Sequence, residues 1–323
     1  MTKIAVLDDW QGIARQCADW TEIQRRADVV FFERHLGDVD MVAQALADFD
    51  IIMAMRERTA FPAALIAKLP KLRMVATTGS RAPSLDLDAC TARSVLVCNT
   101  GGERSGAATA ELALGLLIAA TRHIPAGDMS TRAGRFQSGV PMGEVLEGKT
   151  LGIIGLGRIG ARMARYVQAL GMSVLAWSQN LSAEKAIATG AEYVDKATLL
   201  ARSDAVSLHL VLSDRTRGVL GKDDLAQMKP GAILINTSRG PLVDEAALID
   251  SLRAGHIRAG LDVFAQEPLP SNHPLLSLPN VVLTPHLGYC TREVFSQFYG
   301  ESVENVLAFL DGKPMRMLNP PMQ

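Results

Sequence analysis

The sequence predicts an α/β protein made of two doubly wound parallel sheets. Two observations lead to this fold class. Short apolar runs alternate with helical patterns along the whole chain, and the alternation starts afresh at Thr150, after a long helical pattern at 107–122 and a Gly-rich polar stretch at 127–148. Strands that alternate with helices are typical of parallel sheets covered by helices. A chain of 323 residues has room for about two such domains.

The first hundred residues predict one of these sheets. The expected strands are residues 4–7, 29–32, 51–55 and 72–77. Helical patterns at 40–47 and 63–68 lie between them. Parallel neighbours require right-handed crossovers, so these segments should form one layered unit.

The second sheet is expected from residue 150 to about 287. A helix follows at 292–310 and ends at Asp311-Gly312, which is a helix-stop signal. This last helix can return to the first unit. We therefore expect a discontinuous first domain, residues 1–99 with 291–323, and an inserted second domain, residues 100–290.

The composition excludes several classes of function. Lys and Arg number 33 and Asp and Glu 34, for a formal net charge of -1, which gives no basic face for nucleic acid or for an anionic membrane. The longest apolar run, 112–120, is shorter than the roughly 20 residues of a membrane-spanning helix. The N-terminal apolar stretch runs directly into Asp8, so we expect no signal peptide and a cytoplasmic protein.

The cysteines predict neither disulfides nor a metal site. Cys17, Cys90, Cys98 and Cys290 are scattered, and none lies at metal-ligand spacing from a histidine. We expect reduced packing cysteines, as in a cytosolic protein.

A Gly-rich turn opens the second sheet. Residues 151–160 read Leu-Gly-Ile-Ile-Gly-Leu-Gly-Arg-Ile-Gly, a G-x-G-x-x-G pattern between a predicted strand and a helix expected at 161–170. The first Gly permits the tight turn, the second lets a pyrophosphate approach the backbone, and the third lets helix and strand pack closely. The motif predicts a dinucleotide site, with a structural Gly turn as the alternative. The expected contacts are Gly155, Gly157, Arg158, Ile159 and Gly160.

The acidic residue that usually makes a dinucleotide site select NAD over NADP is missing. NAD-binding units carry an Asp or Glu at the end of the next strand, where it holds the ribose 2′-OH. Here the expected strand 173–177 is followed by Ser178-Gln179-Asn180, with Lys185 as the nearest cation after it. No carboxylate there repels a 2′-phosphate, so the sequence allows NAD or NADP, with Ser178 as a contact.

Three later strands end in side chains capable of chemistry. Strand 232–236 leads to Thr237 and Arg239, strand 260–264 carries Asp262 and leads to Glu267, and strand 281–284 leads to His286 and Gly288. Because the carboxyl ends of parallel strands share one edge, where ligands bind, we expect these residues to converge on a bound dinucleotide. Taken singly, each has an ordinary structural reading as a surface arginine, a loop carboxylate, a turn cap or a packed histidine. Together, after a dinucleotide loop, they predict a catalytic set.

The set fits hydride transfer to a 2-oxo acid. The fork geometry of a guanidinium, here Arg239, holds a substrate carboxylate. An imidazole, here His286, gives a proton to the developing alkoxide. A carboxylate beside the imidazole, here Glu267, holds its tautomer.

These segments together resemble the D-isomer-specific 2-hydroxyacid dehydrogenase family. The resemblance rests on residues 155–160, 228–232, 235–240, 261–264 with 267–268, and 284–286, and it extends more loosely to the N-terminal portion. It implies a Rossmann cofactor domain inserted into a flavodoxin-like substrate domain. It also implies a homodimer formed mainly through the cofactor domains and a substrate bound in the interdomain cleft.

The resemblance assigns roles to individual residues. Arg239 is similar to the family's substrate-carboxylate arginine, His286 to its acid–base histidine, and Glu267 to the partner of that histidine. Asp262 resembles the aspartate that contacts the nicotinamide carboxamide, and Thr109 a cofactor contact where the long helix begins.

Substrate-binding residues are also expected in the first domain. Arg56 is similar to an arginine that some phosphoglycerate dehydrogenases direct at substrate, with a solvated surface arginine as the alternative. Two loops, 78–84 and 99–106, look longer than the family pattern. Gly79 and Ser80 in the first loop can still offer backbone N–H groups to a carboxylate. The departures bear on substrate identity rather than on reaction type.

We therefore predict an NAD(P)-dependent oxidoreductase that interconverts a small 2-oxo acid and its D-2-hydroxy acid, with glyoxylate or hydroxypyruvate favoured. Phosphoglycerate oxidation is the alternative, less favoured because the chain stops at 323 without a further regulatory domain. A non-catalytic dinucleotide-sensing protein is another, against which the intact Arg239, Glu267 and His286 set counts. Formate oxidation does not need Glu267 beside the histidine, so that carboxylate counts against it.

Overall fold

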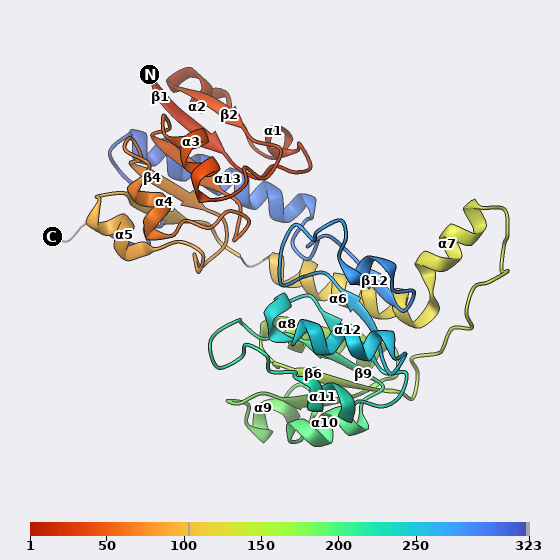
Figure 1. The fold of residues 1–323 in the computed structure, drawn as a ribbon. Coiled ribbons are helices and arrows are strands. Elements are labelled where there is room, and N and C mark those ends of the chain that lie inside the picture. Colours follow the sequence, from red (N-terminus) through yellow and green to blue (C-terminus); the bar gives the residue numbers. More distant parts are fainter. Residues whose placement is uncertain (103, 321–323) are drawn as a thin grey trace. The chain divides into compact units, whose positions relative to one another are not determined.

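The computed structural model describes residues 1–102 and 104–320. The chain divides into two compact units, Met1–Arg104 with Thr291–Gln323, and Ser105–Cys290. The first boundary lies between residues 104 and 105 rather than between 99 and 100, because helix α6 (Ser105–Arg122) begins the second unit. Each unit carries one parallel sheet (Figure 1), which confirms the predicted fold class.

The first unit is built on five parallel strands in the order β2-β1-β3-β4-β5, the flavodoxin-like order. The strands are β1 (Thr2–Val6), β2 (Ala27–Phe31), β3 (Ile51–Ala54), β4 (Met74–Thr77) and β5 (Leu96–Asn99). The helices are α1 (Ala14–Cys17), α2 (Thr21–Arg26), α3 (Val39–Leu46), α4 (Ala63–Ala67), α5 (Leu87–Ala92) and α13 (Arg292–Leu310). Every residue of β3 and β4 is buried, as expected for strands covered on both faces.

Helix α13 returns the C-terminal part of the chain to the first unit (Figure 1). Thr291 caps its first turn by accepting a hydrogen bond from the Val294 N–H. Its inner face buries Phe295, Phe298 and Tyr299, and the Asn305 amide donates to the Asn99 carbonyl at 2.8 Å. The helix ends at Leu310, as the Asp311-Gly312 signal predicts.

The second unit is built on seven parallel strands in the order β12-β11-β10-β9-β6-β7-β8. Counted from β6, this is the doubly wound dinucleotide-binding order with one further strand. The strands are β6 (Thr150–Ile154), β7 (Ser173–Trp177), β8 (Glu192–Tyr193), β9 (Ala205–Leu208), β10 (Ile233–Asn236), β11 (Arg258–Leu261) and β12 (Val281–Leu283). Besides α6, the helices are α7 (Ile124–Arg132), α8 (Arg158–Ala169), α9 (Ala183–Ile187), α10 (Lys196–Arg202), α11 (Lys222–Gln227), η1 (Gly240–Leu242), α12 (Glu245–Arg253) and η2 (Pro274–Ser277).

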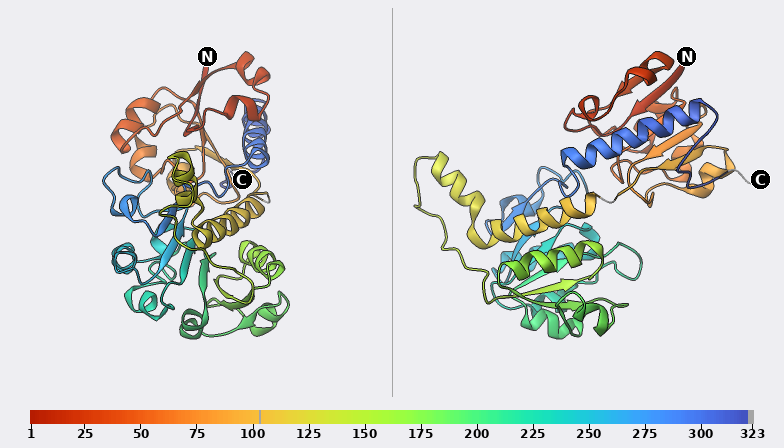
Figure 2. Two further views of the ribbon diagram at one scale, coloured as in Figure 1. Left: turned by 90° about the vertical axis from the view of Figure 1, so that its right-hand side faces the viewer. Right: turned by 180° about the vertical axis from the view of Figure 1, so that it is seen from behind.

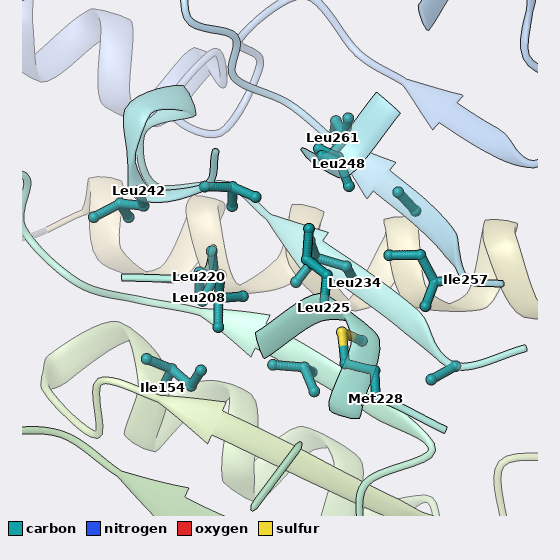
Figure 3. Packing of buried hydrophobic residues seen from close by; sticks show 14 of the residues in the cluster. Ile154, Leu208, Leu220, Leu225, Met228, Leu234, Leu242, Leu248, Ile257 and Leu261 are labelled. Carbon is teal, nitrogen blue, oxygen red and sulfur yellow. The ribbon is translucent and has the colours of Figure 1, made fainter. Parts of the chain in front are cut away.

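Hydrophobic packing covers both faces of this sheet. On one face, Leu225 of α11 and Leu248 of α12 pack with Leu208 and Leu234 of the strands (Figure 3). On the other face, α6 and α8 pack against the alternate strand residues. Full burial of one such leucine contributes roughly 1.5–3 kcal/mol. The sheet is therefore held rigid beneath the loops at its carboxyl edge.

Helix α7 was not predicted from the sequence. It follows α6 almost directly and reaches into the stretch that reads as Gly-rich and polar. Pro125 lies in its first turn, where a missing N–H has no intrahelical partner to lose. A proline just beyond α6 thus begins a second helix. Helix α7 and the chain after it extend away from the rest of the second unit (Figure 2).

Within residues 1–102 and 104–320, no single helix has the length and apolar content to cross a membrane. Helices α6 and α7 have that length and apolar content only when they are taken together, and the chain bends by 64° at their junction.

Candidate active site

The Gly-rich loop lies between β6 and α8, as predicted. Gly155 has a φ of +103°, and a Cβ on Gly160 would lie 2.2 Å from the Gly155 carbonyl oxygen. A Cβ on Gly157 would meet nothing within 4 Å. Helix α8 begins at Arg158 rather than at 161, so Arg158 and Ile159 are its first residues. The open space at Gly157, at the N-terminus of α8, is the cradle that a pyrophosphate requires.

Two alanine substitutions separate the two roles of these glycines. We expect Gly160→Ala to clash with the loop, which costs roughly 1–3 kcal/mol of unfolding free energy and lowers Tm by several degrees. Gly157→Ala should leave Tm unchanged but place a methyl group in the cradle, weakening NADH binding by roughly 5- to 150-fold. Calorimetry and NADH titration measure both effects. A Gly157→Ala protein with unaltered NADH affinity would contradict the cradle.

The turn after β7 carries no carboxylate. Ser178 is half-buried, and its carbonyl accepts from the Leu181 N–H at 3.1 Å. The Gln179 amide lies 3.5 Å from the Arg215 carbonyl oxygen. No acidic side chain in residues 177–182 opposes a 2′-phosphate.

His286 and Glu267 form a hydrogen-bonded pair. His286 Nδ1 lies 2.6 Å from Glu267 Oε2, and the side chains are 18% and 28% exposed. The other carboxylate oxygen, Oε1, accepts from the Phe264 N–H at 2.9 Å. The Tyr289 ring packs edge-on against the imidazole, with ring centres 5.5 Å apart. Both carboxylate oxygens of Glu267 are thus fixed, and with them the imidazole Nδ1.

The carboxylate of this pair is held in its charged form. Burial works to raise the pKa of Glu267, but the hydrogen bond and positive charge of His286, the Phe264 N–H and the Arg239 charge together outweigh it. The pKa of Glu267 therefore lies below its ordinary value. An ionised carboxylate fixes a proton on Nδ1 and leaves Nε2 as the ring nitrogen for proton transfer.

Arg239 follows β10 and caps η1. The loop that carries it is shaped by Asn236, whose amide donates to the Arg239 carbonyl at 2.9 Å and accepts from the Ser238 N–H at 3.0 Å. Arg239 Nη1 lies 2.6 Å from the Ser238 carbonyl oxygen. Strands β10, β11 and β12 are neighbours in the sheet, and a Cβ on Gly240 would lie 2.1 Å from the Phe264 carbonyl carbon. The segments that carry Arg239, Glu267 and His286 therefore leave the same edge of the sheet side by side.

Asp262, a predicted cofactor contact, is fully buried, at 0% exposed. Its carboxylate accepts hydrogen bonds from the Thr284 hydroxyl and from the Leu287 and Gly288 N–H groups. Burial raises its pKa, and these donors oppose the rise. The side chain is committed to the turn that carries His286.

Two further predicted contacts, Thr109 and Gly288, bind each other. The Thr109 hydroxyl, on α6, lies 3.0 Å from the Gly288 carbonyl oxygen and 2.8 Å from that of Ser105. Thr237 behaves differently, because its buried hydroxyl has no hydrogen-bond partner among the described residues. A buried polar atom without a partner is costly, and a bound cofactor group is a suitable partner for it.

In the first unit, Arg56 and Gly79 lie together. A Cβ on Gly79 would lie 2.1 Å from Arg56 Nη1, so the glycine makes room for the guanidinium. The Gly79 N–H, expected to serve a substrate carboxylate, donates instead to the Thr100 hydroxyl at 2.8 Å. Ser80 is exposed. Thr100 was missed because hydroxyls at strand ends carry no motif.

No role was predicted from the sequence for three further residues of the site, Asn236, Thr284 and Tyr289. They shape the turns and packing around His286 and Arg239.

A cavity of about 130 Å³ lies elsewhere, at the amino edge of the sheet beside Lys149 and Arg258, and none of the predicted site residues lines it. In the part of the chain that the structure describes, no three His, Cys, Asp or Glu side chains gather to hold a metal ion.

The fold and the site define a dinucleotide-binding protein of two-domain dehydrogenase architecture. Residues 114–288 match the model of the NAD binding domain of the D-isomer specific 2-hydroxyacid dehydrogenases. The chain belongs to this family, and NAD(P) is its cofactor.

Similar proteins carry different names. D-3-phosphoglycerate dehydrogenase of Mycobacterium bovis is 42% identical over 277 residues, which are 85% of this chain and 52% of that protein. Glyoxylate reductase of Aeropyrum pernix is 41% identical over 264 residues, 79% of this chain and 78% of that protein. The crystal structure of a phosphoglycerate oxidoreductase from Vibrio cholerae has a TM-score of 0.91 at 38% identity, covering 97% of this chain and 100% of that one. The match thus spans about half the length of the D-3-phosphoglycerate dehydrogenases of Mycobacterium bovis and Archaeoglobus fulgidus.

Proposed function

We propose that the protein is an NAD(P)-dependent oxidoreductase that interconverts a small 2-oxo acid and its D-2-hydroxy acid. The observation that carries the proposal is the 2.6 Å contact between His286 Nδ1 and Glu267 Oε2 at the carboxyl edge of a dinucleotide-binding sheet. Arg239 follows β10, the neighbouring strand of β11, at the same edge. The open cradle at Gly157 and the unpartnered Thr237 hydroxyl fit the cofactor.

Three side chains of this chain have separate roles in the proposed reaction. When bound, the nicotinamide supplies the hydride for reduction or accepts it in oxidation. Arg239 holds the substrate carboxylate through its guanidinium fork. His286 gives a proton from Nε2 to the oxygen of the 2-oxo group and takes it back in the reverse direction. Glu267 keeps Nδ1 protonated and stabilises the positive charge of the ring.

The favoured substrates are glyoxylate and hydroxypyruvate, and a phosphorylated three-carbon acid is the alternative. A relative named D-3-phosphoglycerate dehydrogenase and one named glyoxylate reductase match the chain almost equally, at 42% and 41% identity. The predicted first-unit contacts, Arg56, Gly79 and Ser80, bear on this choice.

A panel assay tests the proposal. Purified protein is mixed with NADH or NADPH and with glyoxylate, hydroxypyruvate, pyruvate, phenylpyruvate or phosphohydroxypyruvate. We expect loss of the reduced-nicotinamide absorbance with at least one pair. Cofactor binding without turnover of any 2-oxo acid would favour a dinucleotide-sensing role instead.

Glu267→Gln tests the pairing with His286. The substitution keeps an acceptor for the Phe264 N–H but removes the negative charge, so we expect kcat to fall by roughly tenfold or more. The protonated imidazole loses its anionic neighbour, and reduction should therefore fail at a lower pH than in the unsubstituted protein. The pH dependence of kcat/KM measures this. An unchanged profile would contradict the pairing.

We further propose that a second copy of the chain is the protein's partner. Five large apolar side chains are exposed on α7 and the segment after it, namely Ile124, Met129, Phe136, Met142 and Val145, at 51%, 63%, 72%, 92% and 69%. Exposed apolar clusters mark interaction surfaces. Their place on an extension of the cofactor-binding unit (Figure 2) agrees with a homodimer formed through that unit.

Charge on this surface should separate the copies. We expect Phe136→Asp, with Met129→Asp, to give a monomer by light scattering where the unsubstituted protein gives a dimer. Ile187→Asp is the matched control, because Ile187 is equally exposed, at 71%, but lies on α9. A dimer that survives both substitutions on the extension would place the interface elsewhere.

A further inference from the structure

The carboxylate of Asp262 is enclosed by the turn that carries His286. Oδ1 accepts from the Thr284 hydroxyl at 2.6 Å and from the Leu287 N–H at 2.7 Å, and Oδ2 accepts from the Gly288 N–H at 2.8 Å. All three donors belong to the five residues from Thr284 to Gly288. One buried carboxyl group thus binds three of the five residues of the turn.

The backbone of His286 is bound by the same residue. Its N–H donates to the Asp262 carbonyl at 2.9 Å and to the Thr284 carbonyl at 3.0 Å. The φ of His286 is +55°, in the left-handed region that side chains other than glycine seldom occupy. Such a conformation persists where the surroundings over-determine it. Asp262 supplies that constraint, because it binds the chain on both sides of His286.

The far end of the turn is fixed as well. The Gly288 carbonyl accepts from the Thr109 hydroxyl of α6 at 3.0 Å. A Cβ on Gly288 would lie 3.2 Å from Asp262 Oδ2 and 3.4 Å from Thr109. The turn is therefore packed closely between the end of β11 and helix α6.

We propose that Asp262 is a positioning residue for His286: its carboxylate sets the turn so that Nδ1 meets Glu267. The catalytic part of this inference rests on the proposed function, whereas the geometric part does not. A contact between Asp262 and the cofactor is the competing role, and it predicts a different outcome for every measurement below.

The test uses two substitutions with matched controls. Asp262→Asn replaces one carboxylate oxygen by an NH2 donor, which in either orientation of the amide faces a backbone N–H, that of Leu287 or that of Gly288. Thr284→Val removes one hydrogen bond at nearly constant volume and keeps the charge, so it carries the test if Asp262→Asn does not fold. Asp195→Asn and Thr198→Val are the controls. Asp195 accepts from the Thr198 N–H and hydroxyl at 2.8 and 2.7 Å, in the same Asp–Thr chemistry at the exposed start of α10.

Three quantities are measured. The first is the low-field proton resonance of the His286–Glu267 hydrogen bond in protein without cofactor, assigned by its loss in His286→Gln. The second is Kd for NADH, and the third is the pair kcat and KM with the 2-oxo acid found in the panel assay.

We expect both substitutions to remove or broaden the resonance. Because a small misplacement of a catalytic group costs up to about 10²-fold in rate, kcat should fall by roughly that factor in Asp262→Asn and by roughly tenfold in Thr284→Val. KM and the NADH Kd should change little, and the controls should change nothing. A retained resonance, or a weakened NADH affinity with unchanged kcat, overturns the positioning role. An unsubstituted protein that reduces no 2-oxo acid overturns the proposed function alone, since the resonance still decides the geometry.

Discussion

Replacement of His286 by alanine should lower kcat/KM for the 2-oxo acid by roughly 10²–10⁴-fold, the usual contribution of a positioned acid–base group. The imidazole is the group that Glu267 fixes at 2.6 Å, and its removal leaves the substrate oxygen without a proton donor. The loss should appear in kcat, because in the proposed function Arg239, not His286, holds the substrate carboxylate. Steady-state kinetics over the substrate panel measures it.

The control for this substitution is cofactor affinity. His286 lies on the turn after β12, whereas the phosphate cradle lies between β6 and α8. NADH should therefore bind His286→Ala as it binds the unsubstituted protein. A His286→Ala protein that keeps most of its kcat would contradict the assignment of the acid–base.

Replacement of Arg239 by methionine should raise KM and lower kcat/KM. Removal of one partner from a charge pair shielded from solvent costs roughly 2–5 kcal/mol, which corresponds to roughly 30- to 5000-fold. Arg239→Lys keeps the charge but loses the fork, so its defect should be smaller. Titration with a 2-hydroxy acid in the presence of NADH, with which it does not react, measures the loss of substrate affinity separately from the loss of rate.

A matched surface arginine shows whether charge alone explains the effect. Arg202 binds Glu192 with two hydrogen bonds, at 2.7 and 3.0 Å, on the exposed side of the second unit. Arg202→Met should leave KM unaltered. Equal defects in Arg202→Met and Arg239→Met would remove the case for a substrate-carboxylate arginine.

Much of the fold follows from local sequence signals. The Gly-rich loop places the turn between β6 and α8, because two of its glycines have a steric reason: Gly155 has a φ of +103°, and a Cβ on Gly160 would lie 2.2 Å from the Gly155 carbonyl oxygen. Buried parallel strands read as unbroken apolar runs, as β10 does. Caps such as Asp244, which accepts from the Ala247 N–H, mark the helix starts.

The candidate site is predictable in its residue types but not in its finer contacts. Arg239, Glu267 and His286 stand at strand ends, and a parallel sheet brings strand ends together. Asp262 is also at a strand end, yet its side chain points into the turn of His286. That direction depends on the left-handed φ of His286, which no sequence pattern records. The Gly79 N–H likewise donates to the hydroxyl of Thr100, which directly follows the neighbouring strand β5.

The most direct test of the central claim is the configuration of the product. Hydroxypyruvate is reduced with NADH or NADPH, and the glycerate formed is resolved by chiral chromatography. We predict D-glycerate, absent when His286→Ala replaces the unsubstituted protein. Formation of L-glycerate would contradict a D-2-hydroxyacid dehydrogenase. The same conclusion would follow if the protein bound the cofactor but reduced neither hydroxypyruvate nor any other 2-oxo acid of the panel.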